Sequence, residues 1–332
     1  MLRFLSAFIL LVLLAAGAAG AYAWWFFRTP IPLADDKVAF SIAPGSGLRA
    51  ATRQMRAAGV NVAPTAFEAL ARWQGREQDI KAGSYEIVRG TRPLDLLDKI
   101  TRGEFALAEV RFGEGWTFRQ LREALDAHPE LRHETKGLSG AELMERIGMP
   151  GAAPEGWFFP DTYRFAKQSS DLDVLKAAHG AMRKHLAAAW ARRAPDSPLR
   201  NEHEALVLAS IVEKETGRAD DRGRIAGVFN NRLRIGMRLQ TDPTVIYGIG
   251  ERFDGNLRKR DLETDTPYNT YTRDGLPPTP IALPSLAALE AATRPDGTDA
   301  LYFVARGDGS SEFSRSLADH NRAVRKYQLG GR

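Results

Sequence analysis

The sequence predicts an α+β protein that begins with a transmembrane helix and ends in a mostly helical domain. Three observations support this prediction. An uncharged run near the N-terminus is long enough to cross a bilayer, strands alternate with helices in the next part, and apolar stripes of helical period dominate the remainder. We expect a cytoplasmic tip and anchor at 1–28, a linker at 29–37, an α+β subdomain at 38–112 and a mostly helical domain at 113–330.

The composition is that of a globular protein and excludes several kinds of site. The 332 residues are 44% hydrophobic and 26% charged, which is enough for roughly two or three small domains with cores of their own. The net charge of +5 suits a protein that works beside lipid headgroups, cell-wall polymers or nucleic acid. The chain has no cysteine, so disulfides, thiolate metal sites and a cysteine nucleophile are excluded.

The N-terminal run Phe4–Phe27 contains no charged residue. About 20 apolar residues cross a bilayer, so the length of this run predicts a membrane span. It ends in the aromatic cluster Trp24–Phe27, where an interfacial belt would lie. Ala21-Tyr22-Ala23 has the form of a signal-peptidase site, so a cleaved signal peptide is the alternative. The aromatic cluster and the length favour an uncleaved anchor, and in either case the rest of the chain is exported.

Alternating apolar residues and turn signals predict the elements of the 38–112 subdomain. Strands are expected at 38–42, 80–88 and 105–112, and helices at 46–58, 66–73 and 92–101. Ser46 is placed to cap the first helix, and Arg92-Pro93 opens the third. This order of strands and helices resembles that of LysM-type modules, which bind cell-wall glycans.

Apolar stripes at helical spacing predict mostly helices beyond residue 113. They are expected at 117–127, 139–147, 171–194, 201–217, 220–236, 285–293 and 317–327, with a strand at 301–306. Ser139 with Glu142, and Asn201 with Glu204, form capping-box patterns at two of the starts.

Three segments of this region are rich in turn-forming and polar residues. The segments 155–163 and 267–280 contain too much glycine and proline to be regular, and 236–250 is expected to be a folded-over loop or hairpin that turns at Asp242-Pro243. Their Tyr, Trp, Asn, Gln and Thr side chains suit the hydroxyls, amides and ring faces of sugars. For the aromatic segment 155–163, packing into the core is the simpler explanation.

The helix expected at 201–217 has a carboxylate in an unusual place. Its apolar stripe runs through Leu208, Ile211 and Val212. The next position on that stripe is Glu215, within roughly 20° of Leu208, whereas Glu213 points elsewhere. A carboxylate on an apolar face has a raised pKa, which suits a general acid that works near neutral pH. The structural alternative is a glutamate that ends the helix and reaches a partner such as Arg232 or Arg234.

Other kinds of chemistry have little support in the sequence. The six histidines are scattered, so no metal site is expected. A nucleophile elbow, a phosphate loop and a dinucleotide fingerprint are all missing from the sequence, and the basic residues do not cluster into a nucleic-acid face.

Sugar cleavage by Glu215 has two forms. Glycosidases usually need two carboxylates, and the candidate partners of Glu215 are Glu213, Asp242, Asp261 and Glu263. One carboxylate is enough where the C6 hydroxyl of a muramic residue attacks its own C1, because a single glutamic acid then serves first as acid and later as base.

Long motifs of this chain closely resemble those of the YceG-like endolytic murein transglycosylases. They are ASIVEKETG at 209–217, VFNNRLRIGMRLQTDPTVIYGIGER at 228–252, YNTYTRDGLPP at 268–278, EGWFFPDTY at 155–163, LYFVARGDG…FS…HN within 301–321, and KAGSYEI at 81–87. The resemblance implies a single-pass inner-membrane protein with its bulk in the periplasm. It also implies a LysM-like subdomain followed by a lysozyme-like catalytic domain.

The resemblance further implies the reaction. Such enzymes cleave nascent glycan strands between MurNAc and GlcNAc, leave 1,6-anhydroMurNAc ends, and use no cofactor. Their partners are glycan strands, the membrane, and peptidoglycan synthases or division proteins. The alternative class is a non-catalytic, membrane-tethered protein that binds glycan or acts as a scaffold, and a hydrolase with a second carboxylate is the third.

The resemblance also assigns residues. The second glutamate of the E-K-E-T run, Glu215, is the catalytic acid and base, followed by the small hydroxylated residue Thr216. Gln240 and Asn269 are expected to line the cleft and to orient the acetamido groups and the C6 hydroxyl. The weaker candidates for substrate contact are Tyr247, Tyr268 and Tyr271, for which loop packing is an equal explanation. Asp242 is as much a turn residue as a site residue.

Overall fold

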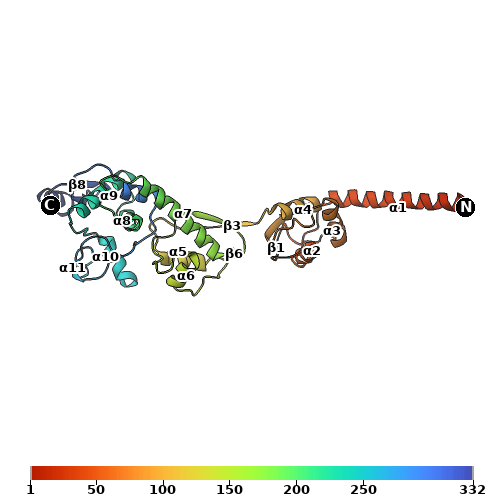
Figure 1. Ribbon diagram of the computed structural model, residues 1–332, viewed down its shortest axis with the longest axis horizontal. Helices are drawn as coiled ribbons and strands as arrows, with labels where there is room; N and C mark the ends of the chain where they lie inside the picture. Colours follow the sequence, from red (N-terminus) through yellow and green to blue (C-terminus); the bar gives the residue numbers. More distant parts are fainter. Residues whose placement is uncertain (1, 331–332) are drawn as a thin grey trace. The chain divides into compact units, whose positions relative to one another are not determined.

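The computed structural model describes residues 2–330, which form two compact units (Figure 1). Unit 1 runs to Glu109 and takes in the short pieces Glu130–Arg132 and Arg164–Ser169, and unit 2 holds the rest. Met1, the first residue of the anchor expected at 1–28, lies outside the described residues. The predicted α+β class is confirmed in its general form, because helices make up about half of the chain and the strands are short.

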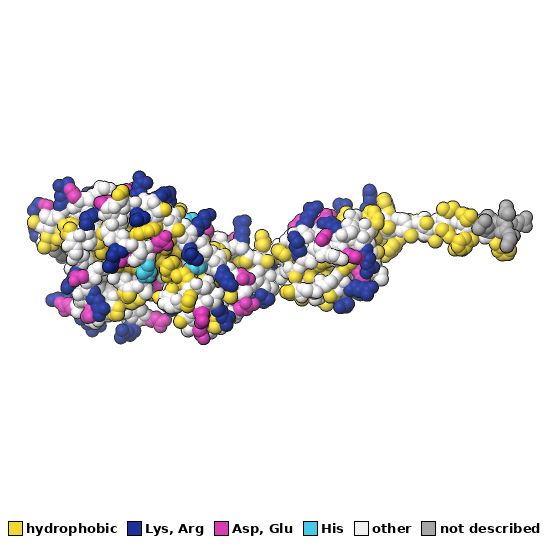
Figure 2. Space-filling model, in the orientation of Figure 1, with side chains coloured by type: hydrophobic (Ala, Val, Ile, Leu, Met, Phe, Trp, Pro, Cys, Tyr) yellow, Lys and Arg dark blue, Asp and Glu magenta, His cyan; other side chains and the backbone are white. Residues whose placement is uncertain are grey.

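Unit 1 begins with the apolar helix α1 (Leu2–Arg28). Its stretch Phe8–Arg28 is long and apolar enough to cross a membrane, a test that a signal sequence also passes. Figure 2 shows hydrophobic side chains exposed along this helix. At its C-terminal end, Phe26 is buried in the core of unit 1, and the ring of Phe27 stacks on that of Trp73 with centroids 5.8 Å apart. The last turns of α1 therefore belong to the folded unit.

The rest of unit 1 is a two-stranded sheet with three helices. Antiparallel strands β1 (Lys37–Ile42) and β2 (Gly83–Val88) pair from Lys37↔Val88 to Ile42↔Gly83, and the helices are α2 (Leu48–Ala57), α3 (Pro64–Trp73) and α4 (Pro93–Arg102). Alternate β1 side chains enter the core because a strand turns successive residues to opposite faces. The predicted elements are confirmed, but the expected cap is wrong, since Gly47 and not Ser46 precedes α2.

Gly83 occupies a crowded position at the start of β2. Its φ is +150°, and a Cβ atom there would lie 2.4 Å from the ring of Phe105. We expect Gly83→Ala to lower the free energy of unfolding by about 1–3 kcal/mol, measured by urea denaturation of the full chain. Gly90→Ala is the matched control, because Gly90 also has a positive φ but open space around it. The control should cost about 1 kcal/mol, and equal losses for both variants would contradict the proposed clash.

Unit 2 is mostly helical and is organised around helix α8 (Glu202–Glu215). Every residue of α8 from Ala205 to Val212 is buried. The surrounding helices are α7 (Asp171–Ala191), α9 (Ala219–Arg234) and α12 (Leu286–Thr293), all of which contact α8. Asn201 caps α8 as expected, but the carboxylate of Glu204 accepts the backbone N–H of Arg200 and so does not complete a capping box.

The remaining helices belong to unit 2, whereas the remaining strands include segments that belong to unit 1. The helices are α5 (Phe118–Asp126), α6 (Gly140–Ile147), α10 (Asp242–Ile249), η1 (Gly250–Arg252), α11 (Lys259–Glu263), α13 (Leu317–Val324) and η2 (Arg325–Leu329). The strand pairs are β3 (Leu107–Arg111) with β5 (Thr162–Ala166), β4 (Leu131–Arg132) with β6 (Ser169–Ser170), and β7 (Tyr302–Ala305) with β8 (Ser311–Ser314).

Two local predictions have opposite outcomes. The capping box of Ser139 and Glu142 at the start of α6 is confirmed. The loop or hairpin expected at 236–250 is wrong over α10, because Asp242 and Pro243 form the first turn of a helix and not a chain reversal. Proline is tolerated there because the first N–H groups of a helix have no partner within the helix.

Candidate active site

Glu215, the last residue of α8, lines a cavity of about 550 Å³ in unit 2. The other walls include Arg232 on α9, the polar residues Gln240, Asp242 and Tyr271, and residues of strand β7 and helix α13. Glu215 as a whole is half-buried, because its backbone ends a helix while its side chain enters the cavity. The carboxyl group is thus largely shielded from bulk water and still borders open space.

The surroundings of Glu215 favour its protonated form. Burial raises the pKa of Glu215 to about 7 and outweighs the other influences. Thr241 Oγ1 donates a hydrogen bond to Glu215 Oε1 and lowers the pKa, the Asp242 carboxylate raises it, and the Arg232 guanidinium lowers it. A carboxyl group that changes protonation near pH 7 can donate a proton in one step and accept one in the next.

The backbone beside Glu215 is held in an uncommon conformation. Gln240 has a φ of +48°, in the left-handed region that non-glycine residues rarely adopt. The loop at Thr270 fixes it, since the Gln240 N–H donates to the Thr270 carbonyl at 3.1 Å and the Thr241 N–H donates to Thr270 Oγ1 at 3.0 Å. This turn places Thr241 against Glu215 and leaves the exposed Gln240 on the cavity wall. Such strain is common at ligand sites.

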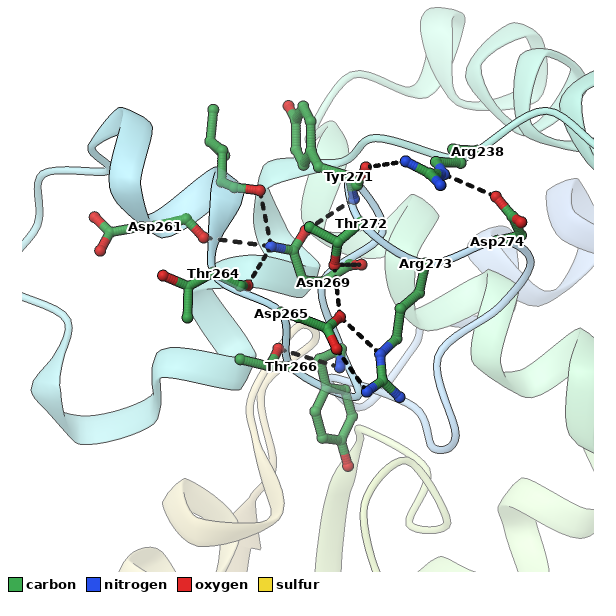
Figure 3. A network of polar contacts seen from close by, with 12 residues as sticks. Arg238, Asp261, Thr264, Asp265, Thr266, Asn269, Tyr271, Thr272, Arg273 and Asp274 are labelled. Atoms are coloured by element: carbon green, nitrogen blue, oxygen red, sulfur yellow. Dashed lines mark hydrogen bonds and ion pairs between the residues drawn. The ribbon is translucent and has the colours of Figure 1, made fainter.

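A buried asparagine holds the loop that carries Tyr271 (Figure 3). Asn269 is fully buried, and its Nδ2 donates to backbone carbonyls, including those of Leu262 at 2.9 Å and Thr264 at 2.7 Å. Asn269 Oδ1 accepts the N–H of Tyr271 at 2.8 Å. Asn269 is not among the described residues that line the Glu215 cavity. Its side chain therefore shapes the loop, and its contacts reach the cavity through Tyr271.

Tyr271 and Asp242 form a hydrogen-bonded pair on the cavity wall. The phenol of Tyr271 donates to Asp242 Oδ1 at 2.6 Å. Of the four carboxylates proposed as partners for Glu215, Asp242 shares its cavity. The other three have local partners: Glu213 accepts from Ser285 N at 3.0 Å and Oγ at 2.5 Å, Asp261 from Arg258 N at 2.8 Å, and Glu263 pairs with Lys259 at 3.6 Å.

The three remaining predicted residues lie outside the described cavity wall. Tyr247 and Tyr268 pack edge to face with centroids 4.8 Å apart. The Tyr247 hydroxyl donates to Glu155 Oε2 at 3.1 Å, and the Tyr268 hydroxyl lies 2.8 Å from Thr279 Oγ1. Thr216 follows the end of α8, where its Oγ1 accepts the N–H of Arg218 at 3.0 Å.

Among the cavity residues that sequence reasoning did not assign to the site are Arg232, Tyr302 and His320. Arg232 is 7% exposed and donates Nε to the Leu301 carbonyl and Nη1 to the Leu239 carbonyl, both at 2.7 Å. His320 stacks on Tyr302 with centroids 5.2 Å apart, and burial, with the nearby Arg232 charge, lowers its pKa. The sequence feature that could have pointed to Arg232 and His320 is their place in motifs shared with the family. The resemblance gave neither residue a role.

A second buried carboxyl group, that of Glu155, lies in the aromatic segment 155–163. Burial raises its pKa to about 7, although the N–H of Phe118 donates to Oε1 at 2.8 Å and the Tyr247 hydroxyl donates to Oε2. Glu155 is 6% exposed. Sequence reasoning favoured core packing for this segment but did not single out Glu155, because nothing in the local pattern shows that its carboxyl group points inward.

The raised pKa of Glu155 predicts a pH-dependent stability. The folded protein binds this proton more tightly than the unfolded chain does, so the free energy of unfolding falls as pH rises from about 4.5 to about 7. Glu155→Gln should remove up to roughly 3 kcal/mol of that fall, measured by urea denaturation at pH 5 and pH 8. The exposed Glu263→Gln is the control and should keep the wild-type difference. If Glu155→Gln keeps it too, the assigned burial is wrong.

Comparisons with known proteins agree on one family. The model of the YceG-like family matches residues 40–326. An endolytic murein transglycosylase of Bacillus subtilis is 32% identical over 308 residues, which cover 87% of this chain and 84% of that protein. One from Streptococcus pneumoniae is 29% identical over 358 residues, covering 97% and 64%. A crystal structure of a YceG-like protein from Listeria monocytogenes superposes with a TM-score of 0.53 at 28% identity, over 86% of this chain and 98% of that one.

Proposed function

This chain belongs to the YceG-like family, and from that membership we propose that it is a membrane-anchored endolytic transglycosylase of peptidoglycan. The names of the Bacillus and Streptococcus relatives support the activity. One observation supports the mechanism: Glu215 ends a buried helix, and its carboxyl group, with a pKa raised to about 7, borders a cavity. That is the protonation behaviour which a single residue needs to act as both acid and base.

We infer a two-step reaction at the bond between MurNAc and GlcNAc. Protonated Glu215 gives its proton to the glycosidic oxygen, and the bond from that oxygen to C1 of MurNAc breaks. The C6 hydroxyl of the same MurNAc then attacks C1, and the Glu215 carboxylate takes the hydroxyl proton. The product end is 1,6-anhydroMurNAc, Glu215 regains its starting proton, and no water is consumed.

The neighbours of Glu215 have distinct roles in this proposal. Thr241 orients the carboxyl group, and Arg232 stabilises the carboxylate that exists between the two proton transfers. The charge of Asp242, held by the Tyr271 hydroxyl, opposes early loss of the proton. The exposed amide of Gln240 and the ring of Tyr271 are placed to contact acetamido and hydroxyl groups of the sugar.

The other predicted residues are assigned to support in this proposal. Asn269 positions Tyr271 through its backbone N–H. Tyr247, Tyr268 and Thr216 hold the loops and the helix end around the cavity. Substituting these residues is expected to affect the free energy of unfolding more than the rate of the chemical step.

We place the protein in the inner membrane, with α1 as the span and unit 2 in the periplasm. The length and composition of Phe8–Arg28 support the span, and a cell-wall substrate requires the outer side of that membrane. Unit 1 is proposed to be LysM-like and unit 2 to be lysozyme-like, as the sequence resemblance implies.

The experiment is cleavage of purified, uncrosslinked glycan strands by the full chain in detergent. A shift of the strands to shorter lengths, with cuts in their interior, is the expected result. The competing function is a membrane-tethered scaffold that binds glycan without cleaving it. Strands that co-sediment with the protein but keep their length would favour that scaffold and reject the enzyme.

A further inference from the structure

Three potential metal ligands from three separate structural elements meet in unit 2, and we propose that they bind one divalent transition cation, Zn²⁺ or Mn²⁺. They are Asp126 at the end of α5, His133 just after β4, and Asp171 at the first position of α7. One ligand atom from each residue lies within 4.8 Å of those from the other two. Atoms at this spacing can share one central ion with only small side-chain adjustments.

Two of these ligands have buried polar atoms that lack partners within residues 2–330. Asp126 Oδ1 and His133 Nδ1 are both inaccessible to solvent, and neither has a hydrogen-bond partner in that part of the chain. Folded proteins rarely leave such atoms unpaired, and each one calls for an explanation such as a water molecule or an ion. A cation between the two residues would satisfy an oxygen and a nitrogen together.

The third ligand is a fully buried carboxylate with a fixed orientation. Asp171 is 0% exposed. The Thr135 N–H lies 3.1 Å from Asp171 Oδ1 and 3.2 Å from Oδ2, and Thr135 Oγ1 donates to Oδ2 at 2.6 Å. Hydrogen bonds of this kind commonly orient the carboxylates that bind metals. These hydrogen bonds leave a lone pair of Asp171 Oδ1 free to bind an ion. They also hold the carboxylate in the same orientation when no ion is bound.

The donor set selects the class of cation. One imidazole nitrogen with two carboxylate oxygens suits Zn²⁺ or Mn²⁺ better than Ca²⁺ or Mg²⁺, which prefer ligand shells made entirely of oxygen. None of the three residues is among the described residues that line the Glu215 cavity. The expected role is therefore structural: the ion would tie α5 and the loop after β4 to the start of α7.

The sequence-based expectation of no metal site overlooked this cluster for a physical reason. That expectation considered whether histidines share a helix face, but His133 has its two carboxylate neighbours on separate helices. The alternative explanation of the cluster is that a nearby positive charge, and not a metal ion, balances its two carboxylates. Arg122, one turn before Asp126, donates Nη2 to the Thr135 carbonyl at 2.7 Å, so its charge lies close to the same carboxylates.

The test measures metal binding and unfolding of the full chain in detergent. Protein stripped with EDTA is titrated separately with Zn²⁺, Mn²⁺, Mg²⁺ and Ca²⁺, and the bound metal is counted by mass spectrometry after removal of excess. We expect one Zn²⁺ or Mn²⁺ per chain and a higher unfolding temperature in the loaded protein. Asp126→Asn and His133→Gln should lose both effects, whereas Asp173→Asn, an exposed position on α7, should keep them.

Three outcomes would overturn the proposal. The first is folded wild-type protein that binds no cation at one equivalent, which would favour the electrostatic explanation by Arg122. The second is unchanged binding by Asp126→Asn and His133→Gln. The third is a response to Mg²⁺ or Ca²⁺ alone, which would reject the donor argument. If a variant fails to fold by circular dichroism, the wild-type stoichiometry decides. Glycan cleavage does not enter the test, so its result is independent of the proposed function.

Discussion

Glu215→Gln is expected to fold normally and to lose strand cleavage by about 10³-fold or more. Glutamine keeps the size of the side chain and can still accept from Thr241, but it can neither give a proton to the glycosidic oxygen nor take one from the C6 hydroxyl. Both steps of the proposed reaction use this one residue, so Glu215→Gln loses proton donation in the first step and proton acceptance in the second. The measurement is the rate of new ends formed from purified strands.

Glu213→Gln is the matched control, two residues earlier on the same helix. Glu213 accepts from the N–H and hydroxyl of Ser285 at the start of α12, so its loss should lower the free energy of unfolding by about 1–2 kcal/mol. The cleavage rate should stay within a few-fold of wild type. If cleavage is lost in Glu213→Gln and kept in Glu215→Gln, the acid has been assigned to the wrong glutamate.

Arg232→Met is expected to lower the free energy of unfolding by about 3–5 kcal/mol. Methionine fills part of the space but leaves the carbonyls of Leu301 and Leu239 without the donors that now reach them. The Arg232 charge also lowers the pKa of Glu215, so its removal should raise that pKa further. The alkaline limb of the pH–rate profile should then move to higher pH, because the first step needs protonated Glu215.

Arg234→Met provides the comparison on the same helix. Arg234 is exposed and pairs with Asp196 at 3.1 Å, a surface contact worth less than about 1 kcal/mol. It should change neither stability nor the pH–rate profile appreciably. If Arg232→Met leaves the free energy of unfolding and the pH–rate profile as unchanged as Arg234→Met does, the guanidinium of Arg232 neither stabilises the fold nor influences the pKa of Glu215.

The sequence predicts the part of the site that depends on a single helix, namely which glutamate of α8 points into the cavity. Helical periodicity distinguishes Glu215 from Glu213 because residues seven apart return to the same face, and the structure places the two carboxylates against different partners. Capping patterns are also local, but their outcomes differ: the capping box at Ser139 forms, whereas Ser46 does not cap α2 and Glu204 does not complete a box at α8. The periodicity of a helix therefore places a side chain more reliably than a capping motif does.

The rest of the site depends on contacts between distant segments. Asn269 matched a motif and was expected at the cleft, but its amide is used by carbonyls that only the folded loop brings within reach. Arg232 and His320 come together at the cavity from positions almost ninety residues apart. Such pairs leave no periodic signal, because tertiary packing and not local propensity sets their distance.

The mass of the new glycan ends tests the central claim most directly. Wild-type protein is incubated with defined glycan strands, and the products are weighed by mass spectrometry. If Glu215 protonates the glycosidic oxygen and the C6 hydroxyl closes on C1, every new MurNAc end is an anhydro end whose mass is one water less than that of a hydrolysed end. New MurNAc ends that carry an added water would show hydrolysis with a second carboxylate and would contradict the single-residue mechanism.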